Sequence, residues 1–267
     1  MKKSNNMKIN KNSDLQTIYD KVHSSDEQFF TYPPIKESFE IFKELDSWKG
    51  LNVLEIGCGP GHLAAMIASA GASEVLACDY SESSIKQASS NYQMDNLTFI
   101  HQDINNFNTD NKFDVVVLQG VLEHLDEPFT SLKYFINKFM KPDGKLINSC
   151  PSFYNPRGYV WMTLSLLFDV PMSLTDLHFL DIEDFKRFSS ENNLNLTWTS
   201  IHQDWGSGLG MIKDYEKRLV NALEDANMPN NKVNKLLKWL EESSKYFVNT
   251  DDTGAIVIYT LYKNEKD

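Results

Sequence analysis

The sequence predicts a doubly wound α/β fold, in which a largely parallel sheet carries helices on both faces. Apolar segments of strand length alternate with helical segments between residues 51 and 150, and this alternation is typical of βαβ units. A glycine-rich turn, GCGPG at 57–61, directly follows the first strand. The chain of 267 residues is long enough for such a core and a cap.

The elements are predicted one by one from apolar periodicity and from residues that begin or end helices. Ser81 is a candidate N-cap, Pro128 stands near the start of the third core helix, and Gly71 follows the first. A later helix is expected after Asp181, which with Asp184 approximates a capping box. The expected strands span residues 51–56, 73–79, 97–103, 112–119, 144–150, 194–201 and 255–263, and the expected core helices span residues 62–71, 81–93 and 126–140.

Composition and charge argue against several classes of function. The net charge is −11, although four lysines and no acid lie in the first twelve residues, so a nucleic-acid partner is not expected. The three cysteines form no CxxC pair, which indicates a reducing cytosol and no zinc knuckle. The N-terminus lacks the apolar region of a signal peptide, and the longest apolar stretch, 159–168, is too short to span a bilayer. We therefore expect a cytoplasmic protein without stable membrane insertion.

The glycine turn follows a strand, where open α/β sheets bind their ligands. Dinucleotide-binding turns follow the pattern G-x-G-x-x-G, whereas this chain has G-x-G-x-G, with His62 at the dinucleotide position of the third glycine. Pro60 also removes one backbone donor. The turn is therefore a poor cradle for a pyrophosphate.

The residues around the turn indicate which kind of cofactor it binds. Glu55 precedes the turn, Asp79 ends the second strand, and Asp103 follows the third. With DVVVLQGVLEHL and KPDGKL, these motifs make residues 51–150 resemble the class I S-adenosylmethionine-dependent methyltransferases, and in particular the small-molecule type of the ubiquinone-biosynthesis O-methyltransferase group. The resemblance implies S-adenosylmethionine (SAM) as cofactor. It also implies a Rossmann-like, seven-stranded sheet of order 3-2-1-4-5-7-6, with the last strand antiparallel and a helical cap.

The same resemblance implies roles for individual residues. Gly57 and Gly59 would leave room for the methionine part of the cofactor, Asp79 would accept hydrogen bonds from the ribose, Asp103 would accept from the adenine amino group, and Glu55 would face the methionine ammonium. The alternative for Asp79 and Asp103 is that they are only turn residues at strand ends. The complete expected cofactor set is Tyr19, Glu55, Gly57, Cys58, Gly59, Gly61, Asp79, Tyr80, Asp103, Ile104, Gln119 and His124.

Two histidines are candidate catalytic residues, because a protonated nucleophile needs a base. His124 follows the fourth strand, and its alternative is a cofactor-side or capping role. His178 stands before the Asp181 helix, and its alternative is a loop histidine with a satisfied hydrogen bond. Some similar methyltransferases hold a divalent metal with E-x-x-E-H, but Gly120 replaces the first glutamate here. We therefore expect no metal.

The acceptor is expected to contact segments outside the core. We expect a small, partly apolar organic acceptor methylated on O or N; the alternatives are a protein-directed methyltransferase or a SAM-binding protein without transfer activity. For most aromatic residues of these segments, the alternative is a place in the cap's own core. The candidate substrate residues are Tyr32, Tyr154, Trp161, His178 and Trp205. The expected parts are a disordered tail (1–14), an N-terminal helical cap segment (15–50), the SAM-binding core (51–150), a cap segment with a helix and the sixth strand (151–204), a helical insertion (205–251), and the last strand and tail (252–267).

The insertion has two apolar stripes of helical spacing with a break at 228–231, and the glycine-rich stretch 204–210 before it suits a hinge. We expect it to form a lid over the acceptor. The alternatives are a dimerisation arm or a purely structural decoration, so a homodimer stays open.

Overall fold

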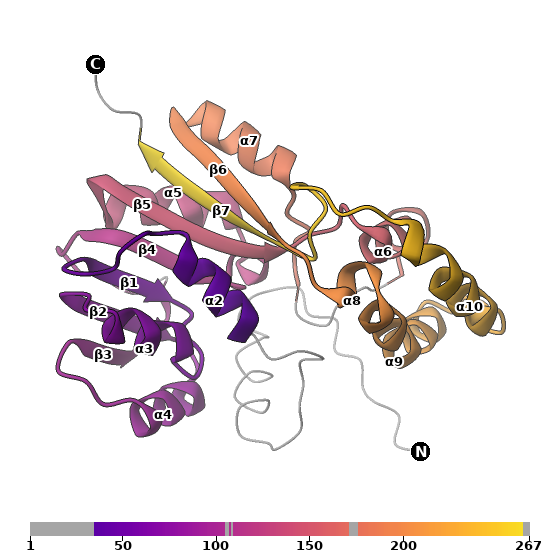
Figure 1. The fold of residues 1–267 in the computed structure, drawn as a ribbon, viewed down its shortest axis with the longest axis horizontal. Coiled ribbons are helices and arrows are strands. Elements are labelled where there is room, and N and C mark those ends of the chain that lie inside the picture. The colour runs from indigo at the N-terminus through magenta and orange to yellow at the C-terminus, as the bar shows by residue number, and fades with distance from the viewer. Residues whose placement is uncertain (1–34, 105–106, 108, 171–175, 264–267) are drawn as a thin grey trace.

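The computed structural model describes residues 35–104, 107, 109–170 and 176–263, and these contain one seven-stranded sheet flanked by helices (Figure 1). The strand order is β3-β2-β1-β4-β5-β7-β6. β7 runs antiparallel to β5 and β6, whereas the other neighbouring strands are parallel. The strands are β1 (Asn52–Ile56), β2 (Glu74–Asp79), β3 (Leu97–His101), β4 (Phe113–Gln119), β5 (Met140–Pro151), β6 (Leu194–Ile201) and β7 (Ile256–Lys263). The predicted order and the antiparallel last strand are confirmed.

Successive side chains of a strand point to opposite faces of the sheet, and in the buried strands they are apolar on both faces. Helices therefore cover both faces. Along β4, Val116 and Leu118 join a core cluster with α5 (Pro128–Lys138) and α7 (Ile182–Glu191). Val115 and Val117 point to the opposite face and join the cluster of α2 (Ile35–Lys43), α3 (His62–Ser69) and α4 (Glu82–Asn91). The part of the expected N-terminal cap segment that the structure describes therefore packs on the sheet, with α2 against α3.

Two helix starts are explained by capping. The Ser81 hydroxyl accepts a hydrogen bond from Ser84 N at the start of α4. Asp181 and Asp184 form a complete capping box at the start of α7, as the sequence predicted. The observed ends of the other helices and strands differ from the predicted ends by a few residues, which is the usual uncertainty of such boundaries.

One predicted boundary is wrong. The turn KPDG at 141–144 was expected to precede the fifth strand, but β5 already begins at Met140. Met140 pairs with Phe113, and pairing resumes only at Lys145 with Val115. The turn is thus a bulge-like irregularity within β5, at which the pairing register with β4 shifts. Such a bulge places extra residues in one strand while the strand continues on both sides of it.

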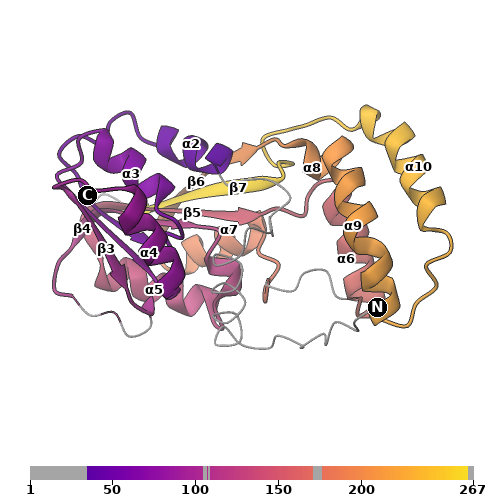
Figure 2. The same ribbon diagram turned by 90° about the horizontal axis from the view of Figure 1, so that it is seen from below.

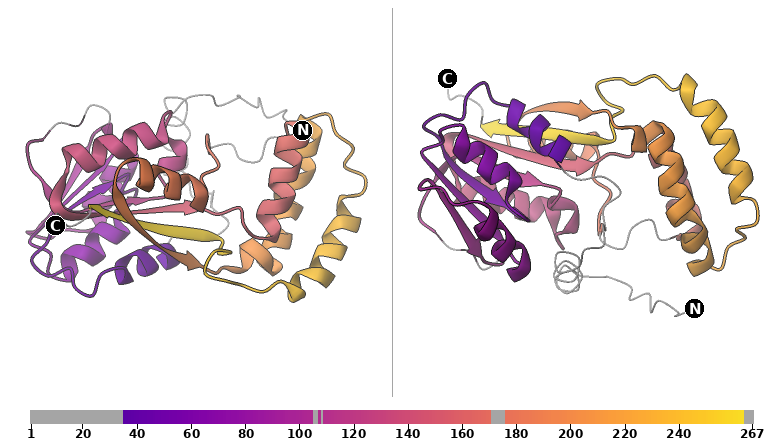
Figure 3. Two further views of the ribbon diagram at one scale, coloured as in Figure 1. Left: turned by 90° about the horizontal axis from the view of Figure 1, so that it is seen from above. Right: turned by 60° about the horizontal axis from the view of Figure 1, so that its bottom comes forward.

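A helical cap lies beyond the carboxyl end of the parallel strands (Figures 2 and 3). It consists of α6 (Pro156–Phe168), the short α8 (Asp204–Ser207), α9 (Leu209–Asp225) and α10 (Val233–Ser243), and a 3-10 turn (Ser244–Tyr246) follows α10. In Figures 2 and 3, α9 lies between α6 and α10. The predicted stripe of α9 is buried in a third core cluster with α6 and α10: Ile212, Tyr215, Leu219 and Leu223.

The glycine-rich stretch before α9 is more regular than the predicted hinge. It forms α8 and leads directly into α9. Gly206 is buried, and a Cβ added there would lie 3.0 Å from Ala255 Cβ. Close packing against the chain before β7 therefore accounts for this glycine.

Candidate cofactor and acceptor site

The glycine turn joins β1 to α3 with a left-handed backbone at all three glycines, where φ is +71° at Gly57, +50° at Gly59 and +83° at Gly61. L side chains disfavour this region, which explains the glycines. A Cβ added to Gly57 would lie 2.4 Å from Val121, and one added to Gly61 would lie 2.6 Å from Phe99. At Gly59 no atom would come within 4 Å. A side chain at Gly57 would therefore collide with Val121, whereas the backbone conformation alone accounts for Gly59, and the role of both glycines beside the methionine part of the cofactor stays a prediction.

Asp79 ties the glycine turn to the neighbouring βα connection. One carboxylate oxygen accepts a hydrogen bond from Gly59 N at 2.8 Å, and the other accepts from Ser81 N at 2.8 Å. The side chain lies at the end of β2 and is 7% exposed. Each carboxylate oxygen can accept a second hydrogen bond. Asp79 is therefore a strand-end turn residue that holds the glycine turn in place, and its role toward the ribose stays a prediction.

Glu55 provides the test of whether a cationic group fits this edge of the sheet. It is 2% exposed, and its Oε2 has no hydrogen-bond partner. Burial raises the pKa of Glu55 to about 8, and the nearby charge of Asp79 acts in the same direction. A buried carboxyl oxygen without a partner is costly unless a proton or a cation meets it. The methionine ammonium of SAM would supply such a cation, so the residues present fit the cofactor.

The other expected cofactor residues gather at the carboxyl ends of the first four strands. His101 Nε2 lies 3.1 Å from the Tyr80 carbonyl oxygen, and Gln119 Oε1 accepts from Ser38 Oγ at 2.8 Å. Cys58 and Ile104 are buried, and Asp103 is partly buried. Tyr19 and the candidate substrate residue Tyr32 lie outside the described residues.

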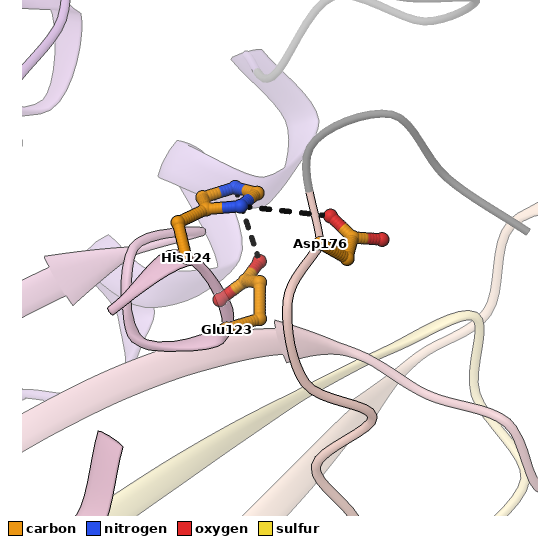
Figure 4. Close-up of side chains that lie close together, drawn as sticks. All are labelled: Glu123, His124 and Asp176. Atoms are coloured by element: carbon orange, nitrogen blue, oxygen red, sulfur yellow. Dashed lines mark ion pairs between the residues drawn. The ribbon is translucent and has the colours of Figure 1, made fainter. Parts of the chain in front are cut away.

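His124 lies between two carboxylates (Figure 4). Its Nε2 is 4.0 Å from Glu123 Oε1, and its Nδ1 is 3.7 Å from Asp176 Oδ1. Glu123 and His124 belong to a single 3-10 turn after β4 (Leu122–His124), whereas Asp176 comes from the segment before α7. Burial raises the pKa of Glu123 to about 7, despite the opposing effect of His124. The arrangement holds the imidazole of His124 with a carboxylate near each ring nitrogen.

The same three groups each offer one atom that could coordinate a metal ion, and these atoms lie within 4.8 Å of one another. Two carboxylates and an imidazole suit several divalent cations. The expectation of no metal was based on Gly120, and Asp176 supplies a carboxylate from another part of the chain. Metal independence therefore stays a prediction, and these three residues are where it can be tested.

His178 is not part of this group. Its Nε2 lies 3.1 Å from the Asp126 carbonyl oxygen. The backbone amides of Leu177 and His178 both donate to the Glu123 carbonyl, at 3.0 and 3.1 Å. These two bonds anchor the segment that carries Asp176 beside His124. The geometry favours the alternative for His178, a loop histidine with a satisfied hydrogen bond.

The candidate substrate residues differ in accessibility. Trp161 is fully buried in the cap core, so the structure favours the alternative that it is part of that core. Tyr154 is partly buried against the core, and burial raises its pKa to about 12. Trp205 is partly exposed, and the guanidinium carbon of Arg157 lies 4.8 Å from the centre of its ring.

Two residues of α2 at this edge were missed by sequence reasoning. Glu37 accepts a hydrogen bond from Ser149 Oγ at the end of β5, and Ser38 holds Gln119. Burial raises the pKa of Glu37 to about 7, opposed by its hydrogen bond from Ser149. The only signal was two polar residues in the first turn of an amphipathic helix. Nothing local relates them to strands far along the chain.

The sheet order, the glycine turn and the strand-end acids together define an α/β protein that binds a nucleoside cofactor at the carboxyl edge of its sheet. The family described as "Methyltransferase domain" matches residues 47–238. The chain therefore belongs to the methyltransferase domain family and is a SAM-dependent methyltransferase.

Individual relatives agree with this assignment. The chain is 30% identical over 196 residues to the mitochondrial ubiquinone biosynthesis O-methyltransferase of Schizosaccharomyces pombe, covering 66% of this chain and 71% of that protein. Among solved structures, DhpI in complex with SAH is 13% identical with a TM-score of 0.61, covering 96% of this chain and 98% of that one. The [4+2]-cyclase SpnF is 13% identical with a TM-score of 0.62, covering 95% and 96%. Because a cyclase shares the fold, the fold alone does not determine the reaction.

Among the described residues, every helix is too short or too polar to cross a bilayer.

Proposed function

We propose that the protein transfers the methyl group of SAM to an oxygen or nitrogen of a small, partly apolar organic molecule, and that a hydroxyl is the favoured acceptor. The observation that carries the proposal is His124 between Glu123 and Asp176, directly after β4. A hydroxyl must lose its proton as it attacks, whereas an unprotonated amine need not. A positioned imidazole beside two carboxylates therefore suits an O–H acceptor.

The site residues divide the work of the reaction. The bound cofactor supplies an electrophilic methyl group on a positively charged sulfur. Asp79, Glu55 and the glycine turn would hold the cofactor at the edge of the sheet to which the residues after β4 also belong. Val121 touches the space beside Gly57 and belongs to the same connection as His124. His124 would accept the acceptor's proton at one ring nitrogen, while a carboxylate beside the other stabilises the imidazolium.

The relatives support the reaction class. The S. pombe protein is named an O-methyltransferase, and it matches this chain over most of its length. A partly apolar acceptor is supported by Tyr154 and Trp205, which stay partly accessible near the carboxyl edge of the sheet. Small-molecule sites commonly combine such aromatic surface with a few polar groups.

The experiment is transfer of a labelled methyl group from SAM to a panel of hydroxylated and amine metabolites, with cell protein as a separate acceptor. We expect label on hydroxylated small molecules, and a decrease in kcat of about 10²–10⁴ in His124→Ala. The matched control is His202→Ala, since this histidine is exposed and is not among the candidate site residues. Label found only on protein would support the protein-directed alternative. No label on any acceptor, with SAM still bound, would support a binding protein without transfer activity.

A further inference from the structure

Arg157 is a buried cation at the junction of the sheet and the cap. It is only 7% exposed, which is unusual for arginine. Its Nε donates to Asp214 Oδ2 at 2.8 Å, and its guanidinium carbon lies 4.8 Å from the centre of the Trp205 ring. Asp214 and Trp205 therefore fix both the direction and the plane of the guanidinium.

The two terminal amino groups of Arg157 make no hydrogen bond to any described residue. The carboxylate that binds its Nε is shared, because Asp214 Oδ1 also accepts from Arg218 at 3.2 Å. Although burial opposes ionisation of Asp214, the two guanidiniums lower its pKa. These four charged N–H donors meet solvent through a residue that is only 7% exposed, where an incoming anion competes with few water molecules. An oxyanion is the partner that satisfies such donors best.

The position of Arg157 relates it to the acceptor side of the site. It stands in the first turn of α6, shortly after β5 ends at Pro151. Near that end, Ser149 pairs with Gln119, the last residue of β4, after which the chain leads to His124. α6 also contacts α8, which carries Trp205, and α8 lies between the end of the sheet and α9 (Figure 1). The positive end of the α6 dipole adds to the charge of Arg157.

We propose that Arg157 binds an anionic group of the acceptor, a carboxylate or a phosphoryl or phosphonyl group, while Trp205 covers one face of the guanidinium. The inference rests on the proposed function, because it assigns a chemical class to the acceptor of the same site. The terminal amino groups would bind two oxygens of the anion side by side, as guanidinium groups do with carboxylate and phosphate. The acceptor would then be polar at this end and carry its hydroxyl toward His124.

The competing explanation is that Arg157 only holds α6 to α9. That role needs only the hydrogen bond from Nε to Asp214 and the contact with the Trp205 ring. It does not use the terminal amino groups of Arg157. Lysine keeps the charge but cannot present two parallel donors. The variant Arg157→Lys therefore separates anion binding from a general effect of charge.

The experiment measures binding of small probes to the full chain saturated with SAH. The probes are benzoate, phenylphosphonate and the neutral benzamide, followed by titration calorimetry or ligand-observed NMR. We expect saturable binding of at least one anion, at least about tenfold tighter than benzamide, and whichever anion binds tighter identifies the carboxylate or the phosphonyl class. Arg157→Lys should weaken the anion at least about tenfold and leave benzamide and SAH unchanged. The matched control is Arg187→Lys, because Arg187 is exposed and pairs with Asp184.

Two results would overturn the inference. One is wild-type protein that binds neither anion better than benzamide. The other is Arg157→Lys that still binds SAH and retains wild-type affinity for the anions. If Arg157→Lys fails to fold, the wild-type comparison of anions with benzamide decides alone. Failure of the proposed function is a different observation, namely absence of methyl transfer to the metabolite panel while the anions still bind.

Discussion

The sheet side of the site buries carboxyl groups whose pKa is raised, whereas the cap side buries an ion pair, Arg157 with Asp214. At the ends of β1 and β4, burial raises the pKa of Glu55 to about 8 and of Glu123 to about 7, so these carboxyls readily hold a proton or meet a cation. On the cap side, Arg157 is buried, and two guanidiniums lower the pKa of Asp214. The difference agrees with the two proposals above, in which the sheet side receives a cationic cofactor and the cap side an anionic acceptor.

The largest expected effect is on the sheet side. Asp79→Ala removes the acceptor of the Gly59 and Ser81 amides as well as of the ribose hydroxyls. Each hydrogen bond to a charged group contributes about 1.5–3 kcal/mol, so SAM affinity should fall by roughly two to four orders of magnitude. Calorimetric titration measures the change, with Asp204→Ala as a control in the cap. Wild-type SAM affinity in Asp79→Ala would sink the ribose assignment.

A variant in the cap should lose stability but keep its affinity for SAM. Leu219 is 1% exposed in the cap cluster, and Leu219→Ala should lower the free energy of unfolding by about 2–5 kcal/mol. SAM affinity should stay within about twofold, because the cofactor residues lie on the sheet side. Chemical denaturation and cofactor titration test the two statements. A large loss of SAM affinity in a folded variant would mean that the division between the two sides is wrong.

The cofactor residues of the sheet could be predicted from the sequence, whereas the contacts made by the cap could not. Asp79, Glu55 and the glycine turn were predictable because local spacing places each at the end of a strand. The contacts His124–Asp176 and Arg157–Asp214 join residues far apart in the chain, and no local pattern encodes such pairs. The hydrophobic stripe of α9 predicted a buried helix but not that Trp161 would be part of the same core. The clash that a side chain at Gly57 would make with Val121 was likewise unforeseen, since a sequence does not show which atoms lie beside a glycine.

A pH experiment tests whether the buried carboxyl group of Glu55 holds a proton in the folded protein. Between its ordinary pKa of 4.5 and about 8, folded Glu55 holds a proton that the unfolded chain lacks. The free energy of unfolding of the cofactor-free protein should therefore fall as pH rises from 5 to 8, by up to about 1.4 kcal/mol per unit for this group. Glu55→Gln should reduce this slope. An unchanged slope in the variant would show that Glu55 ionises normally.

The insertion 205–251 should respond modestly to ligands. We expect amide hydrogen exchange in α9 and α10 to slow when cofactor and acceptor are both bound, as for a lid that closes over the site. Exchange measured at several protein concentrations provides the control. Exchange that ignores ligands but slows with protein concentration would identify the insertion as a dimer interface.

The smallest expected effect is that of metal removal. We predict that EDTA leaves methyl transfer unchanged, since Glu123, His124 and Asp176 can act as a base with two supporting carboxylates and need no ion. Activity is measured before and after dialysis against the chelator. Activity lost on dialysis and restored by magnesium would establish the three residues as a metal site.

The place of β7 in the sheet has a consequence for the order of folding. β7 lies between β5 and β6, and it pairs Tyr262 with Lys145 and Ile256 with Ile201. Until residues 256–263 have been synthesised, β6 has no neighbouring strand, and the cap helices before β7 cannot be held in place by a completed sheet. Such distant pairing slows folding, because a long loop must close before the contacts form. A nascent chain that stops short of Ile256 should therefore expose the edges of β5 and β6 and depend on chaperones.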